Sequence, residues 1–388
     1  MQPAERLKAA FAGEMPDRVP VMPKIWVDLG ARLTGTAIER VIEEPGTAMR
    51  VLVDAALAVG ADGTRQFLFP ARRTRCDEGR LFEVDAAGRR IGAIDWRGGL
   101  MTRLDRIEDF RLDDPEWTAF HTSWTHDSPF VAGMADARRI AVPEADFYRS
   151  HGYGDLLRAM QQHAGDRVGL CGDCDSATLA FHASFRGLER ALLDLVDDPP
   201  LVHAVMEKGE RFAVERGKFN IDAGLRILRL NDSIANMSVI SPRQFQEFIF
   251  PHIKTVCDEL HGYCPEVKIY CHVCGNVLPV IALLVRTGLD CIGPLDPLGG
   301  FSVADARRAA GDAMLLMGGV NTLSFVHSGP QQVRAEALRC IEEGGANDRF
   351  ILGSGCALPR DSRPANIRAL AEAAEAYASD AGGKGIVQ

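Results

Sequence analysis

Short apolar segments alternate with helical segments along the second half of the chain. Each apolar segment resembles a buried strand, and a stretch with helical spacing of its apolar residues follows it. Strands that alternate with helices in this way usually pair in parallel, with the helices as crossovers. Two earlier segments fit the same pattern and bring the predicted strands to eight: 21–26, 61–69, 168–174, 226–232, 267–275, 290–296, 313–320 and 350–359.

Eight such strands predict an α/β fold whose sheet closes into a (β/α)8 barrel, the TIM barrel. An open doubly wound sheet is the alternative, but no Gly-x-Gly-x-x-Gly turn follows an early strand. An amphipathic helix is predicted over residues 3–13, ahead of the first strand. We therefore expect a single barrel domain over residues 1–388 with an N-terminal helical segment.

Residues 70–150 differ in character from the rest of the chain. Residues 82–94 have the pattern of a hairpin with its turn around Gly88, and no sustained period follows them. The segment also holds three of the four tryptophans, which indicates packing rather than a free linker. We expect an inserted hairpin or lid region that packs on the barrel.

Composition and charge exclude several classes of protein. The chain has 388 residues, of which 46% are apolar and 25% charged, as in an ordinary soluble enzyme. Its formal charge of −9 disfavours a nucleic-acid partner. No window of 18 apolar residues predicts a membrane span, and the first residues do not resemble a secretory signal. The ten cysteines are too few for a disulfide scaffold, so we expect reduced thiols and a cytoplasmic protein.

Polar and metal-binding side chains recur where the predicted strands end. Barrel enzymes place their active sites at the carboxyl ends of the strands, so these side chains are candidates for one shared site. Asp232 and Asp296 have an alternative role, because an aspartate in this position often caps the following helix. The candidates are Cys171, Cys174, Asn231, Asp232, His272, Cys274, Asp296, Asn321 and Cys356.

The segment Tyr270-Cys-His-Val-Cys-Gly275 suggests a metal site most strongly. Side chains two apart on a strand share a face, so His272 and Cys274 can both point into the barrel mouth. Cys271 points to the other face, and Cys356 ends the last predicted strand. One His and two Cys make a three-ligand zinc site with an open position, which is the catalytic pattern.

Other interpretations of the cysteines stay open. Cys171 and Cys174 form one Cys-x-x-Cys pair, and Cys271 and Cys274 form another, so a structural four-cysteine site is conceivable. Against it, Cys271 lies inside a predicted strand, which separates the two thiols of its pair. The Cys171–Cys174 pair could also be a redox pair, or the cysteines could be plain packing without a metal.

Several motifs resemble the uroporphyrinogen decarboxylase superfamily. Within it, the sequence is most similar to the zinc-dependent, corrinoid-linked methyltransferases, such as the methylcobamide:coenzyme M methyltransferases. The resemblance covers residues 5–378 and is weakest over 70–150. The motifs are Asp17-Arg-Val-Pro20, Ile240-Ser-Pro-Arg-Gln-Phe245, His272-Val-Cys-Gly-Asn276, Gly318-Gly-Val-Asn321, Gly353-Ser-Gly-Cys-Ala-Leu-Pro-x-Asp-Ser-x-Pro364 and Arg363-Pro-Ala-Asn-Ile-Arg368.

The resemblance implies a methyltransferase that uses Zn2+ and a methylated corrinoid (methylcobamide). His272, Cys274 and Cys356 would hold the zinc, and Asp296 would close its fourth position before substrate arrives. The methyl acceptor would be a thiol or a tetrahydrofolate. No Asp-x-His-x-x-Gly cobalamin signature is present, so a separate carrier protein would bring the corrinoid to the barrel mouth. Asp232 is expected to contact the substrate or His272, with Asn231, Cys174 and Asn321 also lining the substrate site.

The decarboxylase branch of the superfamily is a weaker match. That branch binds its porphyrinogen with paired arginines soon after the Arg-Val-Pro segment, and here only Lys24 and Arg32 are basic in that loop. Two alternatives to methyl transfer remain: a decarboxylase or lyase acting on a smaller acid, and a non-catalytic corrinoid- or zinc-binding partner protein. The sequence leaves the oligomeric state open, a homodimer included.

Overall fold

Seven parallel strands form a curled sheet at the centre of the computed structural model, which describes residues 1–96, 99–345 and 349–384. Every neighbouring pair of strands is parallel, and after β1 the strands follow one another in chain order. The strands are β1 (Gly63–Gln66), β7 (Gly169–Ser176), β8 (Ile227–Asn231), β9 (Lys268–His272), β10 (Cys291–Leu295), β11 (Leu315–Val320) and β12 (Phe350–Ser354).

Residues 20–24 lie between the two edge strands and complete the barrel. Met22 N donates to Leu352 O at 2.8 Å on the β12 side, and Val21 O accepts from Asp62 N at 2.7 Å next to β1. Pro20 and Pro23 lack the backbone N–H that a continuous ladder needs, so this segment makes only isolated bridges. All eight predicted strand segments therefore occupy barrel positions, and the barrel prediction is confirmed.

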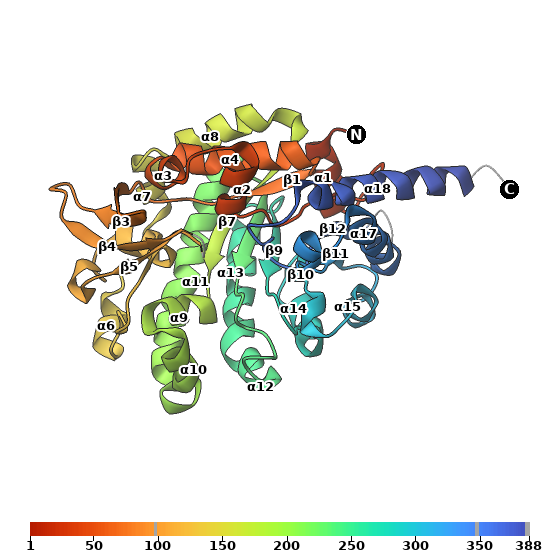
Figure 1. Ribbon diagram of the computed structural model, residues 1–388. Helices are drawn as coiled ribbons and strands as arrows, with labels where there is room; N and C mark the ends of the chain where they lie inside the picture. The colour runs from red at the N-terminus through yellow and green to blue at the C-terminus, as the bar shows by residue number, and fades with distance from the viewer. Residues whose placement is uncertain (97–98, 346–348, 385–388) are drawn as a thin grey trace.

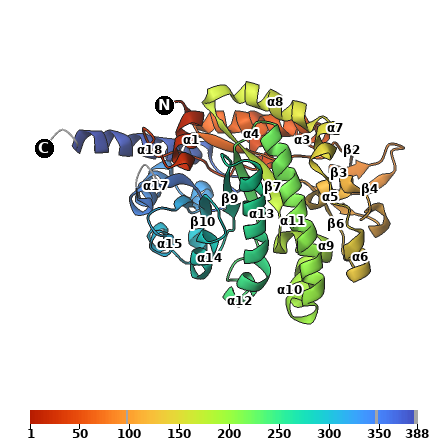
Figure 2. The same ribbon diagram turned by 180° about the vertical axis from the view of Figure 1, so that it is seen from behind.

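Helices cover the outside of the strands, as Figures 1 and 2 show. Three helices lie in the crossover from β7 to β8, and the longer connection from β1 to β7 carries the inserted segment. The helices outside the inserted segment and α1 are α2 (Val27–Thr34), α3 (Ile38–Glu43), α4 (Pro45–Val59), α8 (Tyr153–Ala164), α9 (Leu179–Arg186), α10 (Leu188–Asp197), α11 (Pro199–Asp222), α12 (Pro242–Gln244), α13 (Phe250–Tyr263), α14 (Ile281–Val285), α15 (Val303–Ala310), α16 (Ser324–His327), α17 (Pro330–Gly344) and α18 (Pro364–Lys384).

The predicted N-terminal helix is α1 (Pro3–Ala12), and it closes the end of the barrel where the strands begin. Its buried face places Leu7 and Phe11 against side chains inside the barrel, among them Ile227 and Tyr270. These contacts bury apolar side chains from both partners and leave the carboxyl end of the strands as the open end. In the described part of the chain, no helix is long and apolar enough to cross a membrane.

The segment between β1 and β7 contributes a second sheet at one side of the barrel, drawn in orange and yellow in Figure 1. Its hairpin is the pair β3–β4, with Gly88 in the turn as predicted. Helices α5 (Pro115–Ala119), α6 (Met134–Arg139) and α7 (Ala145–Ser150) complete the segment, and residues 97–98 fall outside the described part. The strands are β2 (Arg73–Asp77), β3 (Arg80–Val84), β4 (Arg90–Asp95), β5 (Met101–Leu104) and β6 (Trp124–Thr125).

Candidate metal centre

Two strands of the barrel bring one histidine and two cysteines together at its open end. His272 ends β9 and is fully buried, and Cys274 follows it two residues later. Cys356 comes two residues after the end of β12. One ligand atom from each residue lies within 4.8 Å of the other two, and the distance from Cys356 Sγ to His272 Nε2 is 3.9 Å. Such a spacing is compatible with one metal ion bound by all three.

The loop that carries Cys356 is held by contacts that require a small residue. Gly355 N donates to Val320 O at 2.8 Å, and a Cβ on Gly355 would come within 2.7 Å of Pro297 Cδ. Ser354 Oγ accepts from Lys24 N at 3.0 Å and donates to the Cys356 carbonyl at 2.6 Å. These bonds fix the backbone of Cys356, so its thiol is positioned by the fold itself.

The protonation states of the three residues suit metal binding. The Cys274 thiol donates a hydrogen bond to Cys356, and this bond lowers the pKa of the Cys356 thiol to about 6. The same bond, together with burial, raises the pKa of Cys274. Burial and the nearby Lys24 hold the pKa of His272 well below its ordinary value, so the imidazole is neutral. A thiolate and a neutral imidazole are the forms in which these side chains bind zinc.

Lys24 lies directly beside this cluster. Its Nζ is 3.2 Å from His272 Nε2, and burial lowers the pKa of its ammonium group to about 7. Among the described residues, the side chains that act on its charge are Arg229, Arg65 and the two thiols, and none is a carboxylate. The amine of Lys24, which is protonated only in part at neutral pH, therefore faces the imidazole and the two thiols.

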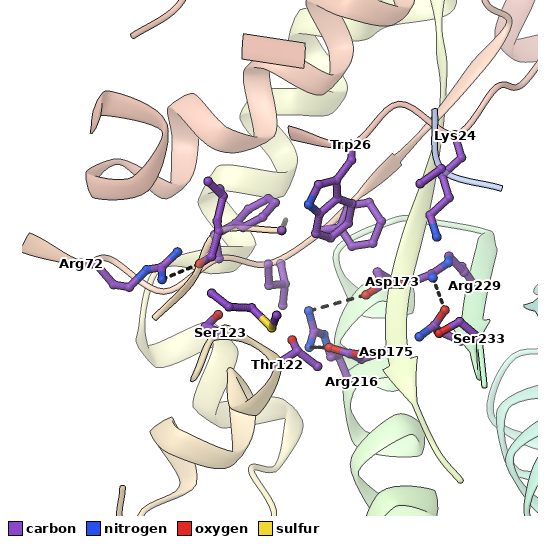
Figure 3. Close-up of a pocket in the computed structure, with 18 residues that line it drawn as sticks. Lys24, Trp26, Arg72, Thr122, Ser123, Asp173, Asp175, Arg216, Arg229 and Ser233 are labelled. Carbon is purple, nitrogen blue, oxygen red and sulfur yellow. Dashed lines mark hydrogen bonds and ion pairs between the residues drawn. The ribbon is translucent and has the colours of Figure 1, made fainter. Parts of the chain in front are cut away.

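A cavity of about 330 Å³ opens next to the cluster. Figure 3 shows aromatic and charged side chains on its walls. Two ion pairs lie on one wall: Arg229 Nη1 with Asp173 Oδ1 at 2.5 Å, and Arg216 Nη1 with Asp175 Oδ2 at 3.2 Å. The lining residues are Lys24, Trp26, Phe67, Leu68, Phe69, Arg72, Gly99, Leu100, Met101, Thr122, Ser123, Asp173, Asp175, Arg216, Arg229, Asn231, Ser233 and Ala357.

Asp175 has an unusual backbone conformation in this wall. Its φ is +62°, a region that residues with a side chain rarely adopt, and the register between β7 and β8 shifts between Asp173 and Asp175. The hydrogen bond from Ser176 N and the ion pair with Arg216 hold its carboxylate in place. Strained residues of this kind concentrate at functional sites, so this wall is a candidate part of the site.

Comparison with known proteins identifies the family. The family model for uroporphyrinogen decarboxylase (URO-D) matches residues 125–377, which is more than half of the chain. The chain belongs to the uroporphyrinogen decarboxylase family. The resemblance seen in the sequence motifs is thereby confirmed.

The relatives of this family member include two kinds of enzyme. It is 27% identical to a methylated-thiol–coenzyme M methyltransferase of Methanosarcina mazei over 197 residues, or 50% of each chain. It is 23% identical to the methylcobamide:CoM methyltransferase MtaA of Methanosarcina barkeri over 158 residues, 40% of this chain and 43% of that one. It is 26% identical to a uroporphyrinogen decarboxylase of Azotobacter vinelandii over 253 residues, 63% of this chain and 68% of that one.

The match extends over about half the length of the first curated relatives. Among solved structures, a methyltransferase from Methanosarcina mazei superposes with a TM-score of 0.71 at 16% identity, covering 97% of this chain and 99% of the other. That similarity supports the fold. Sequence and fold together connect this family member to enzymes that are methyltransferases or decarboxylases.

Asn231 is the one predicted substrate residue that the structure places at the cavity. It is the last residue of β8, and its Oδ1 accepts from Arg229 Nη2 at 2.5 Å. The Asn231 side chain points to the cavity because side chains alternate along a strand. Arg229, two residues earlier on β8, points to the same cavity.

Asp232 takes a different place from the one predicted. Its side chain is buried and accepts from Thr178 Oγ1 and from Ala180 N at 3.0 Å, so it caps the start of α9. Burial raises the pKa of this carboxyl to about 7. Asp232 does not line the cavity and its acceptor oxygens are occupied by the helix, so its position favours the capping role over the predicted substrate contact.

Cys174 and Asn321 also lie away from the cavity. Cys174 is fully buried in the layer between strands and helices, because on β7 it alternates with the cavity residues Asp173 and Asp175. Asn321 Oδ1 accepts from Leu323 N at 2.9 Å and so stabilises the turn after β11. The structure therefore places neither residue at the cavity where the sequence predicted a substrate contact.

Asp296 lies near the cluster but is engaged by the backbone. Its carboxylate accepts from Leu298 N at 3.0 Å and from Gly275 N at 3.1 Å. The second bond ties the end of β10 to the loop that carries Cys274. The possible metal group consists of His272, Cys274 and Cys356 and does not include Asp296. The structure therefore supports the capping role of Asp296.

The four-cysteine alternative receives no support from the described residues. Cys171 points into the barrel, where its thiol contacts Met22 Sδ at 3.7 Å, whereas Cys271 lies in the layer between strands and helices. Burial raises the pKa of Cys171 to about 12 and raises that of Cys271 further, so neither is disposed to ionise. In the part of the chain that the structure describes, only His272, Cys274 and Cys356 form a possible metal group.

Several cavity residues were not predicted from the sequence. The sequence identified Lys24 only as a basic residue of an early loop. No sequence pattern predicted that Arg72, Arg216 and Trp26 line the cavity. The two aspartates in Gly172-Asp-Cys-Asp-Ser176 could have been predicted from the sequence. They are separated by one residue in a predicted strand, so their side chains share a face.

Proposed function

We propose that the protein is a zinc-dependent methyltransferase. It would move a methyl group from a methylated corrinoid, held by a separate carrier protein, to a small-molecule acceptor that is a thiol or a tetrahydrofolate. One observation carries the proposal: the ligand atoms of His272, Cys274 and Cys356 lie within 4.8 Å of one another at the open end of a barrel and beside a cavity. The methyltransferase relatives support the same reaction.

The three side chains fit zinc by their donor atoms. Two sulfurs and one imidazole nitrogen are preferred zinc ligands, and three protein ligands leave one position for a substrate atom. When bound there, zinc would lower the pKa of an acceptor thiol, so that the thiolate is present at neutral pH. Asp296 is an expected fourth ligand only if its two backbone hydrogen bonds are given up.

The residues around the cluster would hold and shield the acceptor. Trp26 and Phe67 pack edge to face, with ring centroids 4.3 Å apart, and form an apolar wall. Lys24 places its amine 3.2 Å from His272 Nε2, where the protonated form would offset the negative charge of thiolates. In the transfer to a thiol, the cobalt–carbon bond breaks with its electron pair left on cobalt, a sulfur–carbon bond forms, and the thiol proton goes to solvent.

The corrinoid carrier would dock at the open end of the barrel, since the cluster is reached from there. The inserted segment that includes β2–β6 flanks the cavity with Leu100 and Met101, and we propose that it acts as a lid. All ten cysteines are unpaired in the structure, which suits a reducing compartment such as the cytoplasm.

The test is transfer from free methylcobalamin to a thiol or a tetrahydrofolate, followed by loss of the methylcobalt absorbance. We expect turnover with the zinc-loaded protein and no turnover in Cys356→Ser. Cys171→Ser is the matched control, because Cys171 is also in the barrel but far from the metal group. Equal turnover in Cys356→Ser and in the unaltered protein would contradict the proposal.

A decarboxylase acting on a smaller acid is the second candidate. The observation in its favour is the excess of cationic side chains on the cavity, where Lys24 and Arg72 add to the two ion pairs. Release of carbon dioxide from a small carboxylic acid by metal-depleted protein, with no methyl transfer, would select it. Binding of zinc and methylcobalamin without either turnover would indicate a non-catalytic partner protein.

A further inference from the structure

The charges on the cavity do not balance. Of the acidic residues that line it, Asp173 pairs with Arg229 and Asp175 pairs with Arg216. Lys24 and Arg72 have no acidic partner among the residues that line the cavity, and Figure 3 shows them on opposite sides of it.

Arg72 is a buried guanidinium with few partners. The residue is 5% exposed and lies just before β2, in the inserted segment. Its Nη1 donates to Leu100 O at 2.7 Å and to Thr102 Oγ1 at 3.2 Å. Among the described residues its Nε has no hydrogen-bond partner. Two neutral oxygens thus hold a side chain that carries a full positive charge.

Glu83 compensates this charge only in part. It is the acidic side chain nearest to Arg72, at 3.9 Å, which is beyond hydrogen-bond distance. Its carboxylate accepts instead from Thr102 Oγ1 and from Trp124 Nε1. Burial also raises the pKa of Glu83, which weakens it as a counter-charge. Burying a cation without a close counter-ion raises the free energy of the folded protein. An anion bound in the cavity would offset this cost.

We propose that Arg72 forms an anion subsite that selects an acceptor with an acidic group, such as a carboxylate, at the end remote from the reacting atom. The inference rests on the proposed function for the position of the reacting atom, at the cluster beside Lys24. The acceptor would then span the cavity, with its nucleophilic end at Lys24 and its anionic end at Arg72. A volume of about 330 Å³ suits a small molecule of this kind.

The charge that binds the anion comes from the inserted segment. The early loop with Lys24 and Arg32 lacks the paired arginines of the decarboxylase branch, and Arg72 places a cation in the cavity from a different element. The segment would thus determine which acceptor is used as well as cover the site.

The test compares two thioethers of equal length, 3-(methylthio)propanoate and 3-(methylthio)propan-1-ol, which cannot accept a methyl group from the corrinoid as a thiol does. We expect calorimetry on the full-length protein to show at least tenfold tighter binding of the carboxylate. The variant is Arg72→Leu with Glu83→Gln, which removes the cation without leaving Glu83 as an unpaired buried acid. It should bind both probes equally, and Arg72→Lys should retain part of the preference.

Arg73→Leu is the matched control, since Arg73 is the next residue but is exposed and donates only a 3.4 Å bond to Ala86 O. It should keep the full preference for the carboxylate. Equal binding of the two probes by the unaltered protein would overturn the proposal, as would a preference that survives in Arg72→Leu/Glu83→Gln.

The corresponding pair of thiols, 3-mercaptopropanoate and 3-mercaptopropan-1-ol, separates this inference from the proposed function. If both hold, KM for the carboxylate thiol rises at least tenfold in Arg72→Leu/Glu83→Gln and KM for the alcohol stays unchanged. If no thiol is methylated but the Arg72-dependent binding persists, the methyltransferase proposal fails and the anion subsite stands.

Discussion

Replacing Asp232 with alanine should cost stability and leave methyl transfer intact. The carboxylate joins the end of β8 to the start of α9 by accepting from Thr178 Oγ1 and from Ala180 N. Loss of a capping acceptor costs about 1 kcal/mol. Thr178 is fully buried, and leaving its hydroxyl without a partner costs about 1–3 kcal/mol more. We therefore expect the free energy of unfolding to fall by about 3 kcal/mol.

Urea unfolding followed by tryptophan fluorescence measures this change as a lower midpoint at an unchanged slope. Asp232→Asn should lose less, because the amide oxygen can still accept from Ala180 N. Asp198→Ala is the control: Asp198 caps α11 by accepting from Leu201 N at 3.2 Å but is only partly buried, so its loss should stay near 1 kcal/mol. At temperatures where Asp232→Ala is folded, its KM and kcat should match those of the unaltered protein.

A small loss of stability together with impaired methyl transfer in Asp232→Ala would show that Asp232 contacts the substrate. A loss of stability near that of Asp198→Ala, combined with a large rise in KM, would contradict the capping role of Asp232. It would also require the cavity to extend past Asn231 to the start of α9.

Three further predictions follow from burial and contacts elsewhere. Cys274→Ser and Cys356→Ser should each keep the fold, as measured by circular dichroism, but bind zinc much more weakly, as measured by elemental analysis. Stoichiometric zinc in both variants would refute the metal site. Burial lowers the pKa of His182 to about 4 from 6.5, so the native state binds fewer protons than the unfolded state and stability should fall as pH falls from 6.5 towards 4. His182→Gln should weaken this dependence in urea titrations at several pH values, and an unchanged pH profile would remove His182 as its source. Gly209→Ala should lose about 1–3 kcal/mol of stability in the same assay, because its Cβ would lie 2.8 Å from the Phe181 ring, and an unaltered midpoint would contradict this close packing.

The barrel was predictable because it depends on local periodicity. All eight apolar segments became barrel positions, and alternation along β9 placed His272 inward and Cys271 outward. The same rule, applied to β7, predicts that Asp173 faces the cavity and that Cys174 faces the helices, as the structure has them.

Other features depend on contacts between distant residues that a single sequence does not reveal. Lys24 meets His272 across 248 residues of chain, and Asp232 meets Thr178 across 54. An aspartate at the end of a strand can cap a helix or face the site, and the choice depends on how the next helix approaches. Arg72 lay in a segment with no sustained pattern, so its place in the cavity required the structure.

The most direct test of the proposed centre is the activity of metal-depleted protein as zinc is added back. The rate of methylcobalamin demethylation with a thiol acceptor is measured at each zinc-to-protein ratio. If His272, Cys274 and Cys356 form one catalytic site, the rate should rise from near zero and level off at about one zinc per chain. A rate in the metal-depleted protein equal to that of the zinc-loaded protein would contradict the account.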